Sequence, residues 1–144
     1  MIKKDKIREC RVYVTSHQVN AEGEKQTIKT ESKGQLSERE GVLYVLYTEK
    51  TEEKTAVKNL LKFEKEPLRV SLKKSGMVSW KMIFVRGRYE KSEYQTPYGA
   101  LEIGAETKEI NAEKRGEKTS LQLVYTLFIQ GEKQADCRLE IEIW

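Results

Sequence analysis

The chain has 144 residues, of which 38% are hydrophobic and 35% charged, and its formal net charge is +4. This length suits one domain, the patterned apolar residues argue against disorder, and no stretch approaches the ~18 apolar residues of a membrane helix. Because residues 1–8 lack the apolar run of a secretion signal, we expect a cytoplasmic protein with a single domain over residues 1–144, in which residues 1–7 form a loosely ordered lead.

Alternation of apolar and polar residues with a period of two dominates the chain and predicts half-buried β-strands. Cys10, Val12 and Val14 share one face of the first such run. Residues typical of turns separate the runs at 21–24, 51–53, 65–67, 75–76 and 114–117. The predicted strands lie near residues 8–20, 24–35, 41–50, 54–64, 67–74, 77–89, 98–111, 119–130 and 133–143.

The segment 55–63 fits two structures. Val57, Leu60 and Leu61 could form the apolar stripe of a short helix, and the same segment also continues the strand pattern. We interpret it as a strand, with a short helix as the alternative.

Strands 41–50 and 77–89 carry apolar residues on both faces. A strand that is apolar on both sides needs cover outside its own sheet. We expect that cover to come from another part of the chain or from a second subunit. The many strands and the lack of convincing helices indicate a sandwich or a barrel.

Gly104 lies inside the predicted strand 98–111. Leu101 and Ile103 share a parity along this strand that Ile110 does not share. Glycine within a strand often marks a β-bulge or a bend at a barrel corner. The sequence therefore predicts a bulge or a barrel bend at Gly104.

The order of several short motifs resembles a known family. The motifs are Lys74-Ser-Gly76, Met82-Ile-Phe84, Gly87, Tyr94-x-Thr-Pro-Tyr-Gly-x-Leu-Glu102, Thr107-x-x-Ile110 and Val124-Tyr125. They resemble the YwiB-like bacterial proteins, a family of domains of unknown function with a calycin-like (lipocalin-type) β-barrel. The resemblance covers most of the chain and is most specific between residues 74 and 143. It implies an all-β, antiparallel, up-and-down calycin-like barrel of about eight strands, and it supplies no activity, substrate or catalytic residue.

A barrel of about eight strands has an interior that side chains just fill or that holds one small ligand. The candidate contacts in the lumen or at its mouth are Trp80, Phe84, Tyr98 and Tyr125. Tyr98 belongs to a Thr-Pro-Tyr-Gly turn, which has a structural explanation as well. Pro97 fixes φ for a turn, and Gly99 permits a positive φ.

Residues 68–88 contain basic residues and no acidic residue. Trp80 and Phe84 lie among these basic residues and could stack on the bases of a single-stranded nucleic acid. They also share strand parity with Val78 and Met82, and as core residues they could not stack on bases. A buried Trp80 would make Trp80→Ala cost roughly 3–5 kcal/mol. The candidate polyanion surface consists of Arg69, Lys73, Lys81, Arg86 and Arg88.

Cys10 and Cys137 are the two cysteines, and His17 is the single histidine. The cysteines lie in the first and last long strands, which are often neighbours in a closed barrel, so the thiols could lie close together. We expect two buried thiols and no disulfide. No Cys-x-x-Cys or His-x-x-x-His spacing occurs, so we expect no metal site and no cofactor.

Signatures of catalysis are missing from the sequence. Glu102 and Glu106 share a strand face, but at about 3.3 Å per residue they lie roughly 13 Å apart, too far for paired glycosidase carboxylates. No Gly-x-Ser-x-Gly motif, P-loop or dinucleotide fingerprint occurs. We therefore favour a protein without an enzymatic step.

Two functional hypotheses follow. The first is non-catalytic binding of a small, partly apolar molecule inside the barrel. The second is an interaction module, monomeric or homodimeric, that binds nucleic acid or a protein partner through the basic residues within 68–88, or that associates with itself through its doubly apolar strands.

Overall fold

The computed structural model describes residues 6–50, 56–76 and 79–144, which form a closed antiparallel barrel of ten strands. Each strand pairs with its neighbours in sequence, and β1 closes the ring by pairing with β10. The prediction of an all-β, antiparallel, up-and-down barrel is confirmed, with ten strands rather than about eight. The strands are β1 (Lys6–Asn20), β2 (Lys25–Arg39), β3 (Val42–Lys50), β4 (Ala56–Glu64), β5 (Arg69–Ser75), β6 (Ser79–Phe84), β7 (Tyr89–Thr96), β8 (Gly99–Arg115), β9 (Lys118–Ile129) and β10 (Glu132–Ile143).

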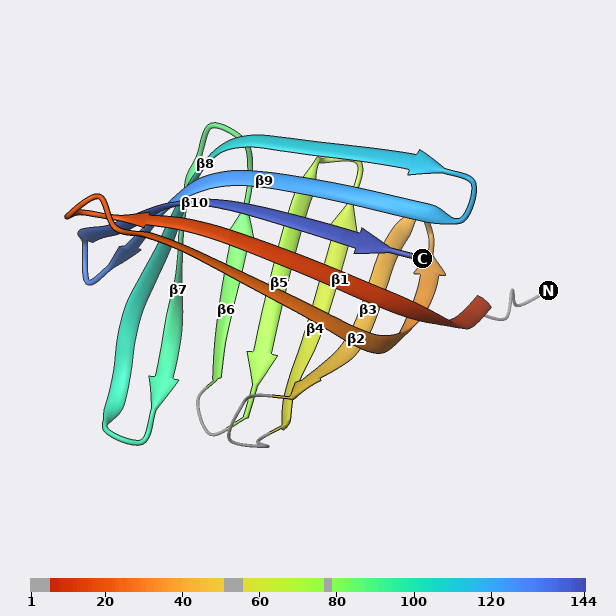
Figure 1. Ribbon diagram of the computed structural model, residues 1–144, viewed down its shortest axis with the longest axis horizontal. Helices are drawn as coiled ribbons and strands as arrows, with labels where there is room; N and C mark the ends of the chain where they lie inside the picture. The colour runs from red at the N-terminus through yellow and green to blue at the C-terminus, as the bar shows by residue number, and fades with distance from the viewer. Residues whose placement is uncertain (1–5, 51–55, 77–78) are drawn as a thin grey trace.

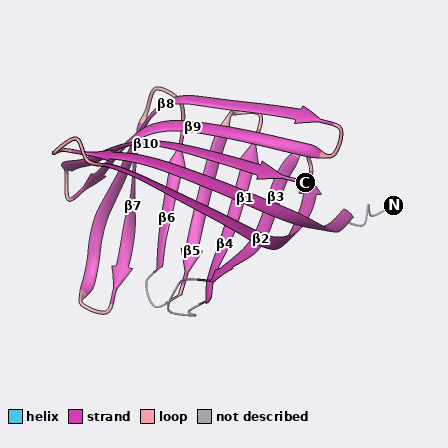
Figure 2. Ribbon diagram, viewed as in Figure 1, coloured by secondary structure: helices cyan, strands magenta, loops and turns pink. Residues whose placement is uncertain are grey.

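The ring is flattened into two layers whose strands cross. β1, β2, β9 and β10 run side by side through one layer, and β3 to β7 run crosswise to them through the other (Figure 1). β8 begins in a hairpin with β7 and continues beside β9, so that it belongs to both layers (Figure 1). The described residues contain strands and loops and no helix (Figure 2).

The bend that carries β2 toward β3 depends on Gly34. A Cβ atom at Gly34 would lie 2.8 Å from the carbonyl oxygen of Leu46. Real Cβ atoms do not approach an oxygen so closely, and therefore a residue without a side chain is required where the two strands meet.

The inward faces of β3 to β6 form rows of side chains that follow the strand register. One row across these strands consists of Leu43, Phe63, Val70 and Phe84, and the next of Val45, Leu61, Leu72 and Met82. From the opposite layer, Val12, Leu121, Leu123, Ile141 and Ile143 close the same core. The period-two alternation of the sequence thus separates a packed interior from a solvated exterior.

The predicted strand 77–89 is wrong in its extent. β6 ends at Phe84, a turn with a positive φ at Gly87 follows, and a separate strand, β7, begins at Tyr89. The backbone N–H of Gly87 donates to the carbonyl of Thr107, which ties this turn to β8. β7 escaped detection because its sequence, YEKSEYQT, is polar and lacks an apolar face.

The ambiguous segment 55–63 is a strand from residue 56, the first of its residues that the structure describes. β4 covers residues 56–64 and pairs with both β3 and β5. Its buried side chains, Asn59, Leu61 and Phe63, have the period of a strand and not that of a helix. The turn predicted at 51–53 lies outside the described residues.

Of the two alternatives predicted at Gly104, a bulge or a barrel bend, the bulge is wrong in its position. The register between β8 and β9 shifts between Thr107 and Glu109, three residues farther along the strand. Gly104 instead lies under the ring of Tyr89, whose hydroxyl oxygen would be 2.2 Å from a Cβ atom at that position. The glycine is therefore explained by the close packing of an aromatic ring, and the bulge near Lys108 explains the change of parity.

The start of the chain is described from Lys6. Residues 1–5 of the predicted lead lie outside the described residues, and β1 already begins at Lys6. Among the described residues, no helix is long and apolar enough to cross a membrane.

Candidate functional site

One end of the barrel interior contains a cavity of about 200 Å³. Side chains from both layers surround it, contributed by β1, β2, β3, β5, β6, β9 and β10. The lining residues are Val14, Ser16, Gln18, Ile28, Thr30, Tyr47, Glu49, Leu72, Lys74, Trp80, Phe84, Tyr125 and Leu139.

The cavity coincides with a change of residue type along the inward faces. Beyond the two apolar rows of β3 to β6, the next row consists of Tyr47, Asn59, Lys74, Trp80 and Tyr94, each opposite the next in the register. We call these five residues the polar row. Strand geometry directs all of them into the barrel, so that polar groups enter an interior that is mainly apolar.

The opposite layer changes in the same way. Gln18 on β1 is opposite Cys137 on β10, which is opposite Tyr125 on β9, which is opposite Thr107 on β8. Toward the other end of the barrel, the inward positions on these strands are occupied by apolar residues such as Leu123. Both layers therefore exchange aliphatic for polar side chains at the same end of the barrel.

An ion pair lies at the centre of this end. Lys74 Nζ is 3.1 Å from Glu49 Oε1, and it lies 5.5 Å from the centroid of the Trp80 ring. The Lys74 side chain is 28% exposed and that of Glu49 13%. Lys74 thus holds its charge between a carboxylate and an aromatic face, and the pair as a whole is neutral.

Aromatic rings form the wall opposite the ion pair. Phe84 and Tyr125 meet edge to face with their centroids 4.8 Å apart. Burial raises the pKa of the Tyr125 hydroxyl, and burial together with the charge of Glu49 raises that of Tyr47. Both phenols remain protonated at neutral pH and can donate a hydrogen bond to a molecule in the cavity.

Three buried polar oxygens have no hydrogen-bond partner among the described residues: Thr30 Oγ1, Asn59 Oδ1 and Thr107 Oγ1. Thr30 lines the cavity, and Asn59 belongs to the polar row between Tyr47 and Lys74. The Asn59 amide nitrogen donates to the Val57 carbonyl at 3.2 Å, which leaves its oxygen as an acceptor. Buried polar atoms without a partner are uncommon in native proteins, and one of these three, Thr30 Oγ1, belongs to a residue that lines the cavity.

Three of the four predicted lumen residues, Trp80, Phe84 and Tyr125, line the cavity. The fourth, Tyr98, is 99% exposed in the turn between β7 and β8 and does not line it. In this turn the Thr96 hydroxyl accepts from the Tyr98 backbone N–H and donates to the Gly99 carbonyl. These bonds agree with the structural explanation of the Thr-Pro-Tyr-Gly motif.

The sequence analysis did not select Glu49, Lys74, Asn59 or Thr30 as lumen residues. A signal was present for the two charged residues, since Lys74 shares strand parity with Val70 and Leu72, and Glu49 shares it with Tyr47. The charges of these two residues favoured the outer face of the barrel, whereas their parity along the strands places them on the inner face.

The five predicted polyanion contacts are divided between two places. Lys73 and Lys81 lie directly opposite each other on the outer face, and Arg69 shares that face of β5. Arg86 and Arg88 are exposed residues around the turn between β6 and β7. Trp80 and Phe84 point into the barrel and are not available for stacking on bases.

The outer face of β3 to β6 also carries residues that were not predicted as contacts. Leu46 and Leu60, 50% and 38% exposed, lie opposite each other, so the apolar outer face of β3 has no cover from the described residues. We call the basic residues of this face the outer cationic face. It comprises Lys50, Lys58, Lys62, Arg69, Lys73 and Lys81, and Glu64 is the one described carboxylate among them, paired with Lys62.

The expected proximity of the two thiols is wrong. Cys137 is opposite Gln18, and Cys10 lies eight residues before Gln18 on β1, about 26 Å away at roughly 3.3 Å per residue. Both cysteines are free and buried. Burial raises the pKa of the Cys137 thiol to about 11 and also raises that of Cys10. A disulfide between them would require the barrel to unfold.

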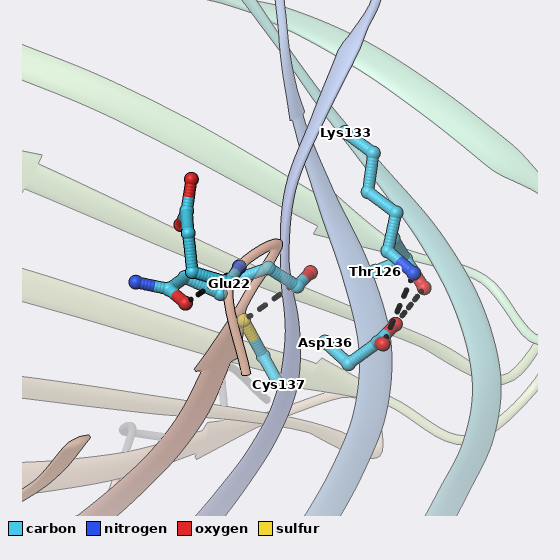
Figure 3. Close-up of polar contacts among 7 residues, drawn as sticks. Glu22, Thr126, Lys133, Asp136 and Cys137 are labelled. Carbon is cyan, nitrogen blue, oxygen red and sulfur yellow. Dashed lines mark hydrogen bonds and ion pairs between the residues drawn. The ribbon is translucent and has the colours of Figure 1, made fainter. Parts of the chain in front are cut away.

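Adjacent residues of β10 point to opposite sides of the barrel wall. Cys137 points inward, whereas the Asp136 carboxylate meets Thr126 and Lys133 on the outside (Figure 3). Hydrogen bonds from Lys133 and Thr126 lower the pKa of Asp136.

The other candidate groups do not assemble a metal site or a carboxylate pair. His17 lies on β1 with Nδ1 3.1 Å from Thr27 Oγ1 and Nε2 3.8 Å from Glu140 Oε1. Glu102 is paired with Lys91, and Glu106 is exposed. Within 6–50, 56–76 and 79–144, no group of three or more His, Cys, Asp or Glu residues could hold a metal ion.

Comparison with known proteins gives a family and a fold. The family model described as "Domain of unknown function (DUF1934)" matches residues 12–141. The crystal structure of the ywiB protein from Bacillus subtilis superposes with a TM-score of 0.82 at 22% sequence identity, over 95% of this chain and 91% of that one. No curated protein matches the sequence. At this identity the structural likeness supports the barrel alone.

Proposed function

Since the chain belongs to the DUF1934 family, whose function is unknown, we propose its function from the site itself: the barrel binds one small, partly apolar molecule in the cavity beside Trp80 and Tyr125, without a catalytic step. The polar row at one end of an otherwise apolar lumen carries this proposal. A barrel that served only as a scaffold would gain stability from aliphatic residues at these positions.

The size of the cavity sets the size of the ligand. Water occupies about 30 Å³ in the liquid, so a cavity of about 200 Å³ has room for about six or seven water-sized groups. Pockets for drug-sized ligands run from about 300 to 1,000 Å³. The ligand is therefore smaller than a drug or a long-chain lipid.

The composition of the wall sets the chemistry of the ligand. Phe84, Leu72 and Leu139 offer apolar surface, and Tyr125, Thr30 and the Lys74–Glu49 pair offer polar contacts. Small-molecule pockets are usually lined mainly by apolar residues, and this cavity has a larger polar share, since seven of its thirteen lining residues carry a hydroxyl, amide or charged group. A molecule with an apolar body and one polar head fits this division.

Native mass spectrometry of gently purified protein tests the proposal. We expect extra mass under native conditions that disappears on denaturation. Ser16→Phe, which fills the cavity from β1, removes that mass, whereas Thr15→Phe, on the outer side of the same strand, keeps it. A bare native mass in unmodified protein, with no binding to added small aromatic compounds, would contradict the proposal.

The outer cationic face supports a second candidate function as an interaction module. Six cations face one carboxylate there, and Leu46 and Leu60 add exposed apolar surface. An acidic protein partner matches this face better than single-stranded nucleic acid, because Trp80 and Phe84 point inward. Binding of polyglutamate that is lost in Lys73→Glu/Lys81→Glu and retained in Lys29→Glu/Lys33→Glu on β2 supports it. Equal loss in both pairs would assign the effect to net charge.

We also propose that the protein acts in the cytoplasm. A reducing compartment suits two buried thiols that the strand register keeps apart.

A further inference from the structure

We infer that the cavity selects a net-neutral ligand whose head group carries a hydrogen-bond donor beside an acceptor, as a primary amide does. This inference deepens the proposed function and rests on it. It is carried by the Lys74–Glu49 ion pair and by the buried hydroxyl oxygen of Thr30, which lines the cavity and has no partner among the described residues.

The charge of the site argues for neutrality. Lys74 and Glu49 cancel each other at 3.1 Å, and neither is more than 28% exposed. The other cavity-lining residues carry no formal charge, because the two lining tyrosines keep their protons at neutral pH. A ligand with one net charge would leave that charge uncompensated inside the barrel, where desolvation is costly.

The unused hydrogen-bond donors and acceptors of the site argue for a ligand head group that both accepts and donates hydrogen bonds. The Lys74 ammonium has three donors, and Glu49 Oε1 is its one hydrogen-bond acceptor among the described residues. Within the same residues, Glu49 Oε2 has no hydrogen-bond partner, and the Asn59 oxygen has none either. Donors and acceptors that are still available therefore lie beside each other at the Lys74–Glu49 ion pair, which lines the cavity.

An amide satisfies both sides at once. Its oxygen accepts from Lys74 or Thr30, and its NH₂ group donates to Glu49. An alkyl chain or a phenyl ring attached to the amide would lie against Trp80 and Phe84, which form the apolar side of the same cavity.

Three probes with one phenyl body test the charge preference of the unmodified protein. They are 2-phenylacetamide (neutral), phenylacetate (anionic) and phenethylamine (cationic), titrated by isothermal calorimetry at pH 7. We expect the amide to bind at least tenfold more tightly than either charged probe. Trp80 fluorescence reports whether a probe enters the cavity once Trp144→Phe has removed the other tryptophan.

Two variants should reverse the preference in opposite directions. Glu49→Gln leaves Lys74 uncompensated, so phenylacetate becomes the tightest of the three probes. Lys74→Met leaves Glu49 uncompensated, so phenethylamine becomes the tightest. The matched controls are Lys62→Met and Glu64→Gln, which break an outward ion pair of 3.2 Å on β4 and should leave the order unchanged.

The outcomes separate this inference from the proposed function. Binding of all three probes with similar affinity, or tightest binding of a charged probe to the unmodified protein, overturns the preference and retains a binding cavity. Because this comparison needs no variant at the ion pair, it decides the inference even if those variants fail to fold. Binding of none of the probes, together with a bare native mass, overturns both.

Discussion

The two ends of the barrel interior are built from the same strands and differ in what those strands place inside. Toward one end, β3 to β5 contribute Val45, Leu61 and Val70, all fully buried. Toward the other, the next row of the same faces contributes the polar row, and a cavity opens beside it. The difference means that side chains leave a larger space unfilled beside the polar row than among the apolar rows.

The largest expected effect tests the packed end. Leu61→Ala removes a fully buried side chain from the apolar core, and we expect it to lower the free energy of unfolding by about 2–5 kcal/mol. Urea denaturation followed by circular dichroism measures this loss. Thr30→Ala, at the end that contains the cavity, is the control. We expect it to leave the free energy of unfolding unchanged or to raise it, because it removes an oxygen that has no partner among the described residues. Equal losses in the two variants would remove the distinction between the ends.

The end of the barrel that contains the cavity should tolerate the loss of a side chain larger than that of Leu61. Trp80 is half-buried and borders the cavity, so Trp80→Ala should cost about 1–2 kcal/mol, below the roughly 3–5 kcal/mol of a fully buried tryptophan. The same denaturation experiment measures it. A loss as large as that of Leu61→Ala would mean that Trp80 belongs to the packed core.

The reactivity of the Cys137 thiol tests how well the layer opposite the polar row is closed to solvent. Its pKa of about 11 leaves about 0.1% thiolate at pH 8, so labelling of the folded protein by an aromatic disulfide should be about 10²-fold slower than labelling of the denatured chain. The raised pKa stabilises the fold fully below the ordinary thiol pKa of 9.0, and this contribution is lost as the pH rises toward 11. Cys137→Ser removes that part of the pH dependence. Rapid labelling under native conditions would show that this wall opens.

The smallest expected effect lies on the outer side of the same strand. Asp136 has a lowered pKa because of Lys133 and Thr126, so its contribution is present above the ordinary carboxyl pKa of 3.8 and is lost as the pH falls through the folded value. The carboxylate is about half exposed, and Asp136→Asn should therefore cost less than about 0.5 kcal/mol at pH 7. A cost above 1 kcal/mol would place this surface group among the determinants of the fold.

The sequence was sufficient for the fold and for part of the cavity, and the reasons are local. Period-two alternation is a property of neighbouring residues, and it correctly placed Trp80, Phe84 and Tyr125 on inward faces. β7 was missed because its polar residues carry no such signal. Lys74 was not predicted as a lumen residue because its charge was weighed above its parity.

The rest of the site depends on register, which a sequence does not display. Glu49 and Lys74 are 25 residues apart, and β4 lies between their strands. Whether two such side chains meet is determined by how far each strand slides along its neighbour. The separation of Cys10 from Cys137 has a different origin. Each cysteine lies in the first half of its strand, and β1 and β10 are antiparallel, so their first halves lie toward opposite ends of the pair.

The closed ring of strands also limits how the protein can aggregate. Fibril growth begins when a free strand edge recruits another chain, and a barrel in which β1 pairs with β10 presents no such edge. A free edge forms only if two neighbouring strands of the barrel separate. Between the described residues, β6 and β7 share two register pairs, Ser79 with Gln95 and Trp80 with Tyr94, the fewest of any neighbouring strands. The polar row crosses from β6 to β7 between Trp80 and Tyr94. A ligand that bridges the row would therefore also oppose separation of these two strands, the step from which fibril formation would most easily begin.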